Sequence, residues 1–124
     1  MSIRVAVDDL QRVVACFGWG YLVSVGGERP HIEAQPITWL DGALHIAGIG
    51  QTSMTNIIRK PQVTLVFPPG AAVAVAGSVE QVPAGFTLIV DGAAEIAERA
   101  KRTAILVRPS SAVFHRPATV LPAD

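Results

Sequence analysis

The segment from Gly48 to Val66 constrains the fold more than any other part of this sequence. Glycines flank a run of hydroxyl residues that opens a short helix expected over 52–60. Pro61 ends this helix, because proline lacks a backbone N–H and disfavours a helical conformation in the residue before it. The apolar run that follows predicts a strand over 62–67. The chain is therefore expected to pass through one short helix directly into a strand.

Turn signals divide most of the remaining chain into short strands. Asp41-Gly42 predicts a tight hairpin, and the Gly-Gly-Glu-Arg run at 26–29 predicts another turn. Pro36 lies inside one of the apolar runs and indicates a bulge or an unpaired N–H there. Residues 71–85 are rich in small side chains and are compatible with strand, helix or loop. The strands expected from these patterns cover 19–25, 31–40, 43–49, 62–67, 86–96 and 103–108, with a charged turn at 98–102 and an extension of the sheet at 112–115.

A second helix is expected near the N-terminus. Asp8 or Asp9 can cap it, and one apolar face is formed at positions i, i+3, i+4 and i+7 by Leu10, Val13, Val14 and Phe17. Cys16 is the single cysteine, which predicts a buried free thiol and excludes an internal disulfide. Strands in hairpin order with few helices favour an antiparallel β-barrel over an alternating α/β fold.

Length and composition limit the domain organisation and the partners. The chain of 124 residues is expected to form a single domain, 1–124, and its 50% hydrophobic residues suffice for a core. The apolar runs are broken well before the roughly 20 residues of a membrane-spanning helix, and no signal-peptide pattern opens the chain. Ten basic and ten acidic residues are scattered, which leaves no electrostatic footprint for nucleic acid or an acidic membrane. These observations predict a cytoplasmic protein with small-molecule or protein partners.

Four local motifs follow one another along the chain: Gly-Glu-Arg-Pro-His at 27–31, Trp-Leu-Asp-Gly at 39–42 with Leu-His-Ile at 44–46, Asn-Ile-Ile-Arg-Lys-Pro at 56–61, and Thr-Leu-Ile-Val-Asp-Gly-Ala-Ala at 87–94. Their order and spacing over residues 8–116 resemble those of the pyridoxamine 5′-phosphate oxidase-like FMN-binding split-barrel family. The resemblance implies a mainly β fold, a split antiparallel β-barrel of about six strands with two short helices.

The resemblance also implies a homodimer with FMN bound in grooves between the subunits, or in relatives a deazaflavin (F420) or haem. The protein is therefore expected to be a flavin- or deazaflavin-binding oxidoreductase in which the cofactor performs the electron transfer. The alternative is a non-catalytic split-barrel dimer that binds haem or another small ligand, or that has no cofactor. A purely structural interaction domain is a third interpretation. No side chain is assigned as acid or base, so enzymatic activity stays open at this point.

The start of the 52–60 helix is the expected phosphate site, because free backbone N–H groups and the helix dipole attract anions. In the resembled family a basic residue three positions before the helix asparagine, here Asn56, usually holds the phosphate. This chain has Ser53 at that position, and neither Gln51 nor Thr52 supplies the charge. The resemblance therefore implies a phosphate site with fewer charges than in relatives.

Two stripes are expected on this helix at about 100° per residue. One carries Ser53, Asn56 and Lys60, so Lys60 can partly substitute for the absent basic residue. The structural alternative is that Thr52 and Ser53 only cap the helix and that Lys60 is solvated. The other stripe is apolar and is expected to pack on the barrel through Met54, Ile57 and Ile58.

Two residues near the C-terminus complete the candidate site. His115 and Arg116 lie where relatives often reach toward the partner's cofactor, whereas His31 and His45 are expected to be hydrogen-bonded strand residues. No metal site is expected, because no set of His and acidic residues has suitable spacing. The candidates for cofactor binding are therefore Gln51, Thr52, Ser53, Asn56, Lys60, His115 and Arg116.

Overall fold

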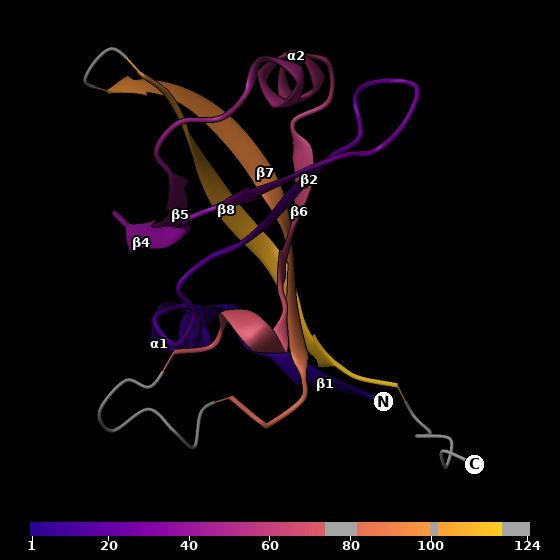
Figure 1. Ribbon diagram of the computed structural model, residues 1–124. Helices are drawn as coiled ribbons and strands as arrows, with labels where there is room; N and C mark the ends of the chain where they lie inside the picture. The colour runs from indigo at the N-terminus through magenta and orange to yellow at the C-terminus, as the bar shows by residue number, and fades with distance from the viewer. Residues whose placement is uncertain (74–81, 100–101, 118–124) are drawn as a thin grey trace.

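The structure is a computed structural model that describes residues 1–73, 82–99 and 102–117 (Figure 1). Its described part is mainly β, as the sequence predicts, with one antiparallel sheet of eight strands. The strands are β1 Ser2–Val5, β2 Gly20–Ser24, β3 His31–Gln35, β4 Thr38–Leu40, β5 Ala43–Ile46, β6 Gln62–Phe67, β7 Thr87–Arg99 and β8 Arg102–His115. The helices are α1 Leu10–Val14, which follows a 3₁₀ turn at Val7–Asp9, and α2 Gln51–Arg59; a further 3₁₀ turn covers Pro69–Ala71.

The sheet order is β3-β2-β6-β7-β8-β5-β4, and β1 pairs with β8 beside this path. β3 and β4 lie at opposite ends of the order, although only Pro36 and Ile37 separate them in sequence. The prediction of one strand over 31–40 is therefore wrong. Pro36 has no N–H for a ladder, and the chain crosses there from one edge of the sheet to the other. Ile37 is buried at the crossing.

Inward-facing side chains of the strands and one face of α1 form the core. The predicted apolar face of the first helix is confirmed, and the Phe17 ring lies 5.3 Å from that of Phe67. Cys16 is buried, as expected. The predicted cap by Asp8 or Asp9 is wrong, because neither the 3₁₀ turn nor α1 has a side-chain cap bond, and Asp9 instead pairs with Arg12 at 2.7 Å.

The predicted turn at Asp41-Gly42 is confirmed. Both residues have positive φ, 52° and 77°, the conformation that a tight hairpin between β4 and β5 requires. β7 and β8 form a much longer hairpin than expected, with strands of 13 and 14 residues. Their register shifts at Asp91/Gly92, where an added Cβ on Gly92 would lie 2.5 Å from the Arg108 carbonyl oxygen. Glycine is needed at this bulge because the two backbones approach so closely.

Three segments were not predicted, were predicted wrongly or lie partly outside the described residues. β1 was not predicted, although its Ser-Ile-Arg-Val sequence alternates polar and apolar residues; its first three residues are exposed in the structure. The predicted charged turn at 98–102 is strand at both ends, where Arg99 pairs with Arg102, and its residues 100–101 lie outside the described part. Most of the unassigned segment 71–85, residues 74–81, also lies outside it.

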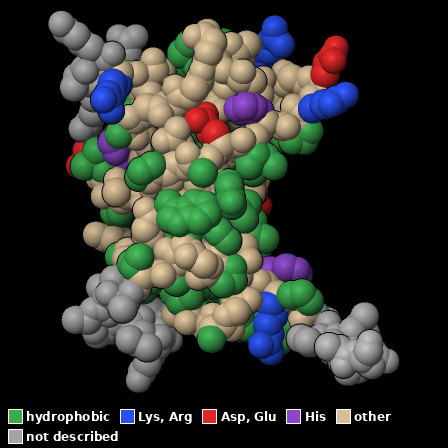
Figure 2. Space-filling model, in the orientation of Figure 1, with side chains coloured by type: hydrophobic (Ala, Val, Ile, Leu, Met, Phe, Trp, Pro, Cys, Tyr) green, Lys and Arg blue, Asp and Glu red, His purple; other side chains and the backbone are tan. Residues whose placement is uncertain are grey.

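The two helices lie toward opposite ends of the sheet, with α2 near one end and α1 and β1 near the other (Figure 1). On the face shown in Figure 2, hydrophobic side chains gather across the middle of the molecule and most charged side chains lie toward its ends. No helix among the described residues is long and apolar enough to cross a membrane.

Candidate functional site

α2 turns a largely polar face toward the barrel. Its buried residues are Ser53, Asn56 and Ile57, whereas Met54 is half-buried and Ile58 is 67% exposed. The predicted packing stripe is therefore correct for Ile57 and wrong for Ile58. The helix is rotated because strand residues offer hydrogen-bond partners to Ser53 and Asn56, and buried polar groups need such partners.

Asn56 holds the turn between β2 and β3 against the helix. Its Nδ2 donates to the buried Ser24 Oγ at 3.1 Å. An added Cβ on Gly26 would lie 2.1 Å from the Asn56 carbonyl oxygen, and one on Gly27 would lie 3.0 Å from Asn56 Oδ1. The Asn56 side chain is thus enclosed by its own chain and serves the packing of α2.

The carboxylate of Glu33, on β3, lies at the start of α2. The backbone N–H of Gly50 donates to Glu33 Oε1 at 3.2 Å, and the hydroxyl of Ser53 donates to the same oxygen. Gln35 Nε2 donates to Glu33 Oε2 at 2.8 Å. An anion therefore lies at the start of the helix, but it is a carboxylate of the chain itself and not a ligand phosphate.

Glu33 is held in its charged form. Partial burial raises the pKa of the carboxyl group, but hydrogen bonds from Ser53, Gln35 and Gly50 and the charge of nearby His31 outweigh this, so that the pKa lies below its usual value. Glu33 is consequently an anion at neutral pH. Sequence reasoning missed it; the alternating pattern of β3, which puts His31, Glu33 and Gln35 on one side, is the signal that could have indicated it.

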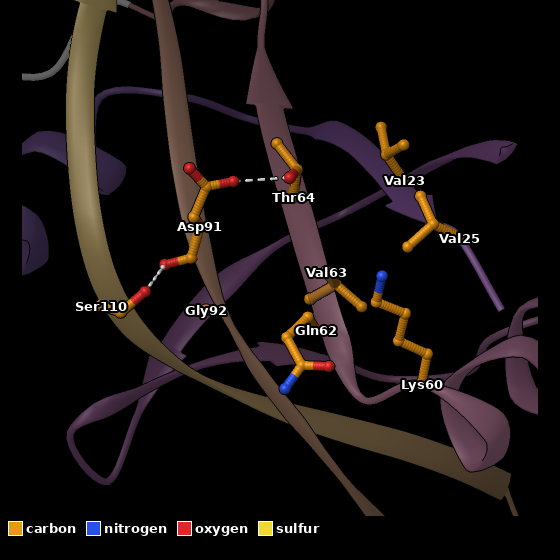
Figure 3. A pocket seen from close by; sticks show the side chains of 9 residues that line it. All are labelled: Val23, Val25, Lys60, Gln62, Val63, Thr64, Asp91, Gly92 and Ser110. Atoms are coloured by element: carbon orange, nitrogen blue, oxygen red, sulfur yellow. Dashed lines mark hydrogen bonds between the residues drawn. The ribbon is translucent and has the colours of Figure 1, made fainter.

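The remaining candidates on or next to α2 are exposed. Gln51 and Thr52 lie in its first turn, and Lys60 follows its last residue. Lys60 lines a pocket of about 250 Å³ on the outer side of β2, β6, β7 and β8 (Figure 3). The other lining residues are Val23, Val25, Gln62, Val63, Thr64, Asp91, Gly92 and Ser110.

This pocket, called here the Lys60 pocket, combines one cation with an anion and apolar walls. Figure 3 shows Lys60 and Asp91 on opposite sides of it. Thr64 Oγ1 donates to Asp91 Oδ1 at 2.6 Å, and Ser110 Oγ donates to the Asp91 carbonyl oxygen at 3.1 Å. Such groups can hold a ligand that carries an anionic end and hydroxyl groups.

His115 and Arg116 lie at the end of β8, far from α2 (Figure 1). His115 Nδ1 is 3.0 Å from Ser2 Oγ, and the Arg116 guanidinium lies 4.8 Å from the centre of the Phe86 ring. Along β7, four residues or about 13 Å separate Thr87, the cross-strand partner of His115, from Asp91. A single chain therefore does not bring His115 and Lys60 together.

The other two histidines differ in their surroundings. His31 is half-buried near Glu33. His45 Nε2 is buried and has no hydrogen-bond partner among the described residues. Within the same described ranges, no group of three His, Cys, Asp or Glu side chains is arranged to hold a metal ion.

Comparisons with known proteins identify the fold. No family model and no curated protein matches the sequence. A candidate pyridoxamine 5′-phosphate oxidase from Listeria innocua superposes with a TM-score of 0.62 at 16% identity, covering 87% of this chain and 96% of that one. An FAD-binding protein from Mesorhizobium loti gives 0.65 at 10% identity over 94% and 99%. The haem storage protein of Vibrio cholerae gives 0.58 at 14% identity over 86% and 92%.

These similarities extend over most of each chain, whereas the sequence identities are low. The chain therefore has the split-barrel fold of the pyridoxamine 5′-phosphate oxidase-like proteins.

Proposed function

We propose that the protein is a homodimer that binds a flavin or deazaflavin cofactor, with the anionic end of the cofactor at Lys60. The observation that carries this proposal is the Lys60 pocket, in which an ammonium group, a carboxylate and valine side chains line one hollow. The similarity to an FAD-binding protein supports the choice of cofactor class.

The size of the pocket supports a site shared by two chains. Pockets for drug-sized ligands usually enclose roughly 300–1,000 Å³ and cover most of the ligand. The Lys60 pocket, at about 250 Å³, is smaller than this and would provide one wall of such a site. A second subunit on the same side of the sheet would supply the opposite wall.

The outer side of the sheet carries an apolar row suited to a second copy of the chain. Cross-strand partners in this row, called here the outer row, are Tyr21, Val66, Ile89 and Val113. In the next row Ile32 is 59% exposed opposite Val23, a residue of the Lys60 pocket. Antiparallel sheets with a solvated face usually carry polar residues there. A partner subunit on the outer row would remove this apolar surface from water.

Such a dimer would also bring the distant candidates together. Along β7, Ile89 of the outer row lies two residues after Thr87 and two residues before Asp91. Thr87 is the cross-strand partner of His115, so His115 and Asp91 lie on opposite sides of the outer row. A two-fold axis along the outer row would therefore place His115 of one subunit opposite the Asp91 end of the other. In this arrangement His115 would contact a ligand in the Lys60 pocket of the other subunit, a contact that one chain cannot make.

The chain's own groups would bind and shield the cofactor. Lys60 would hold a phosphate through a charge-assisted hydrogen bond. Asp91 would accept hydrogen bonds from cofactor hydroxyl groups, and Val23 and Val25 would exclude water from one side. The bound flavin would supply the electron transfer, which protein side chains cannot perform.

Two ligands and two variants test the proposal. Lys60→Ala should weaken FMN binding roughly tenfold or more, because a charge-assisted contact is lost, and should leave riboflavin binding almost unchanged, because riboflavin has no phosphate. Arg59→Ala is the matched control, since Arg59 is a neighbouring exposed cation that does not line the pocket. Fluorescence titration of each ligand at low salt measures the effect. An equal loss of FMN affinity in both variants, or no flavin binding by the unaltered protein, would contradict the proposal.

A non-catalytic dimer with haem or without a cofactor is the second candidate. The position of Glu33 favours it, because the carboxylate fills the helix start that was expected to take a flavin phosphate. The similarity to a haem storage protein adds support. The visible spectrum of freshly purified protein separates the candidates, because flavin, deazaflavin and haem absorb at different wavelengths and a cofactor-free protein is colourless.

A further inference from the structure

We propose that Glu33 is a specificity-determining residue whose carboxylate occupies the start of α2 and excludes a ligand phosphate from it. The resemblance of the sequence to the split-barrel family implies a flavin phosphate near this helix, and the residues present here do not fit one. This inference rests on the contacts of Glu33, and only its consequence for the Lys60 pocket rests on the proposed function.

The carboxylate takes the Gly50 N–H and the Ser53 hydroxyl, two donors that an external anion at this helix start would use. Both Glu33 oxygens lie within 3.4 Å of the Gly50 nitrogen, and both would lie 3.6 Å from a Cβ added to Gly50. A phosphate bound to the same N–H would stand next to a carboxylate of equal sign. Like charges at this separation repel strongly where water is partly excluded.

Ser53 is unavailable to an external ligand for the same reason. Its side chain is fully buried and donates its hydroxyl hydrogen to Glu33. A ligand could reach the hydroxyl only after the carboxylate had moved away. Gln35 opposes that movement, because its amide donates to the second carboxylate oxygen from the same strand.

The contacts of Glu33 also explain the residue at position 53. A hydroxyl group satisfies the carboxylate with a neutral donor, whereas a basic side chain there would pair with Glu33 and not with a ligand. The serine at position 53 is therefore explained by the presence of Glu33, because the serine hydroxyl serves as a donor to this carboxylate. If the proposed function holds, the anionic end of the cofactor is confined to the Lys60 pocket.

Binding of inorganic phosphate, measured by calorimetry at pH 7 and low salt, tests the inference without any flavin. Glu33→Ala should bind phosphate about tenfold more tightly than the unaltered protein, because the Gly50 N–H and the Ser53 hydroxyl become available to it. The double variant Glu33→Ala/Ser53→Ala should lose most of that gain. Glu28→Ala is the matched control, since it removes an exposed carboxylate from the β2–β3 turn.

Each outcome decides the inference. No gain in Glu33→Ala, or an equal gain in Glu28→Ala, would overturn it, the latter because net charge alone would then explain the effect. If Glu33→Ala does not fold, Glu33→Gln keeps the shape and removes the charge, and it should still bind phosphate several-fold more tightly; no gain there overturns the inference too. Failure of the proposed function would appear separately, as an unchanged FMN affinity in Lys60→Ala.

Discussion

At the scale of single residues, the chain uses polar side chains to attach α2 to the sheet. Glu33 binds Gly50 and Ser53, and Asn56 binds Ser24, so two separate hydrogen-bonded groups hold the start and the middle of the helix. A buried polar group costs about 1–3 kcal/mol when its partner is removed. The same residues that looked like ligand contacts are therefore needed to position the helix.

The charge on Glu33 predicts a pH dependence of stability. Its pKa is lowered in the folded protein, so its contribution is fully present above the usual value of 4.5 and is lost as pH falls through the lower folded-state pKa. Urea midpoints measured from pH 7 down to pH 3 should therefore fall more steeply for the unaltered protein than for Glu33→Gln. Parallel pH profiles of the two proteins would show that the carboxylate is not linked to folding.

At the scale of elements, local signals predicted more than long-range contacts did. β6 and the Asp41-Gly42 hairpin are found where the sequence predicted them, because proline, glycine and alternation act over a few residues. The face of α2 was predicted only in part. Its partners Glu33 and Ser24 are 20 and 32 residues away from Ser53 and Asn56, and hydrophobic periodicity contains no information about them.

The observed face of α2 predicts unequal effects of two adjacent substitutions. Ile57→Asp should destabilise the protein by about 3 kcal/mol or more, because an unpaired charge would enter the core where Ile57 is 3% exposed. Ile58→Asp introduces the same side chain at an exposed position and should change stability by less than about 0.5 kcal/mol. Thermal or urea unfolding measures both. Similar losses in the two variants would contradict the helix orientation described above.

At the scale of the whole molecule, the split barrel leaves an apolar row on the outer side of its sheet, between rows that carry Asp91 and His115. The inner side forms the core, and the outer row continues the apolar pattern across β2, β6, β7 and β8. The Lys60 pocket opens next to this row on the same side. Assembly and ligand binding are therefore expected to depend on each other, because a partner that covers the row also closes the pocket.

This coupling predicts that one substitution in the outer row weakens both assembly and binding. The unaltered protein should sediment at micromolar concentration with about twice its chain mass of 13.0 kDa. Ile89→Lys should give monomers, because a charge at the centre of an apolar interface cannot be solvated in the dimer. The same variant should lose flavin affinity although Ile89 does not line the pocket. Ile58→Lys is the control, an equal change at an exposed position on α2, and should remain dimeric. If Ile89→Lys remains dimeric, the interface does not lie on the outer row. If it is a monomer with full flavin affinity, one chain alone completes the site.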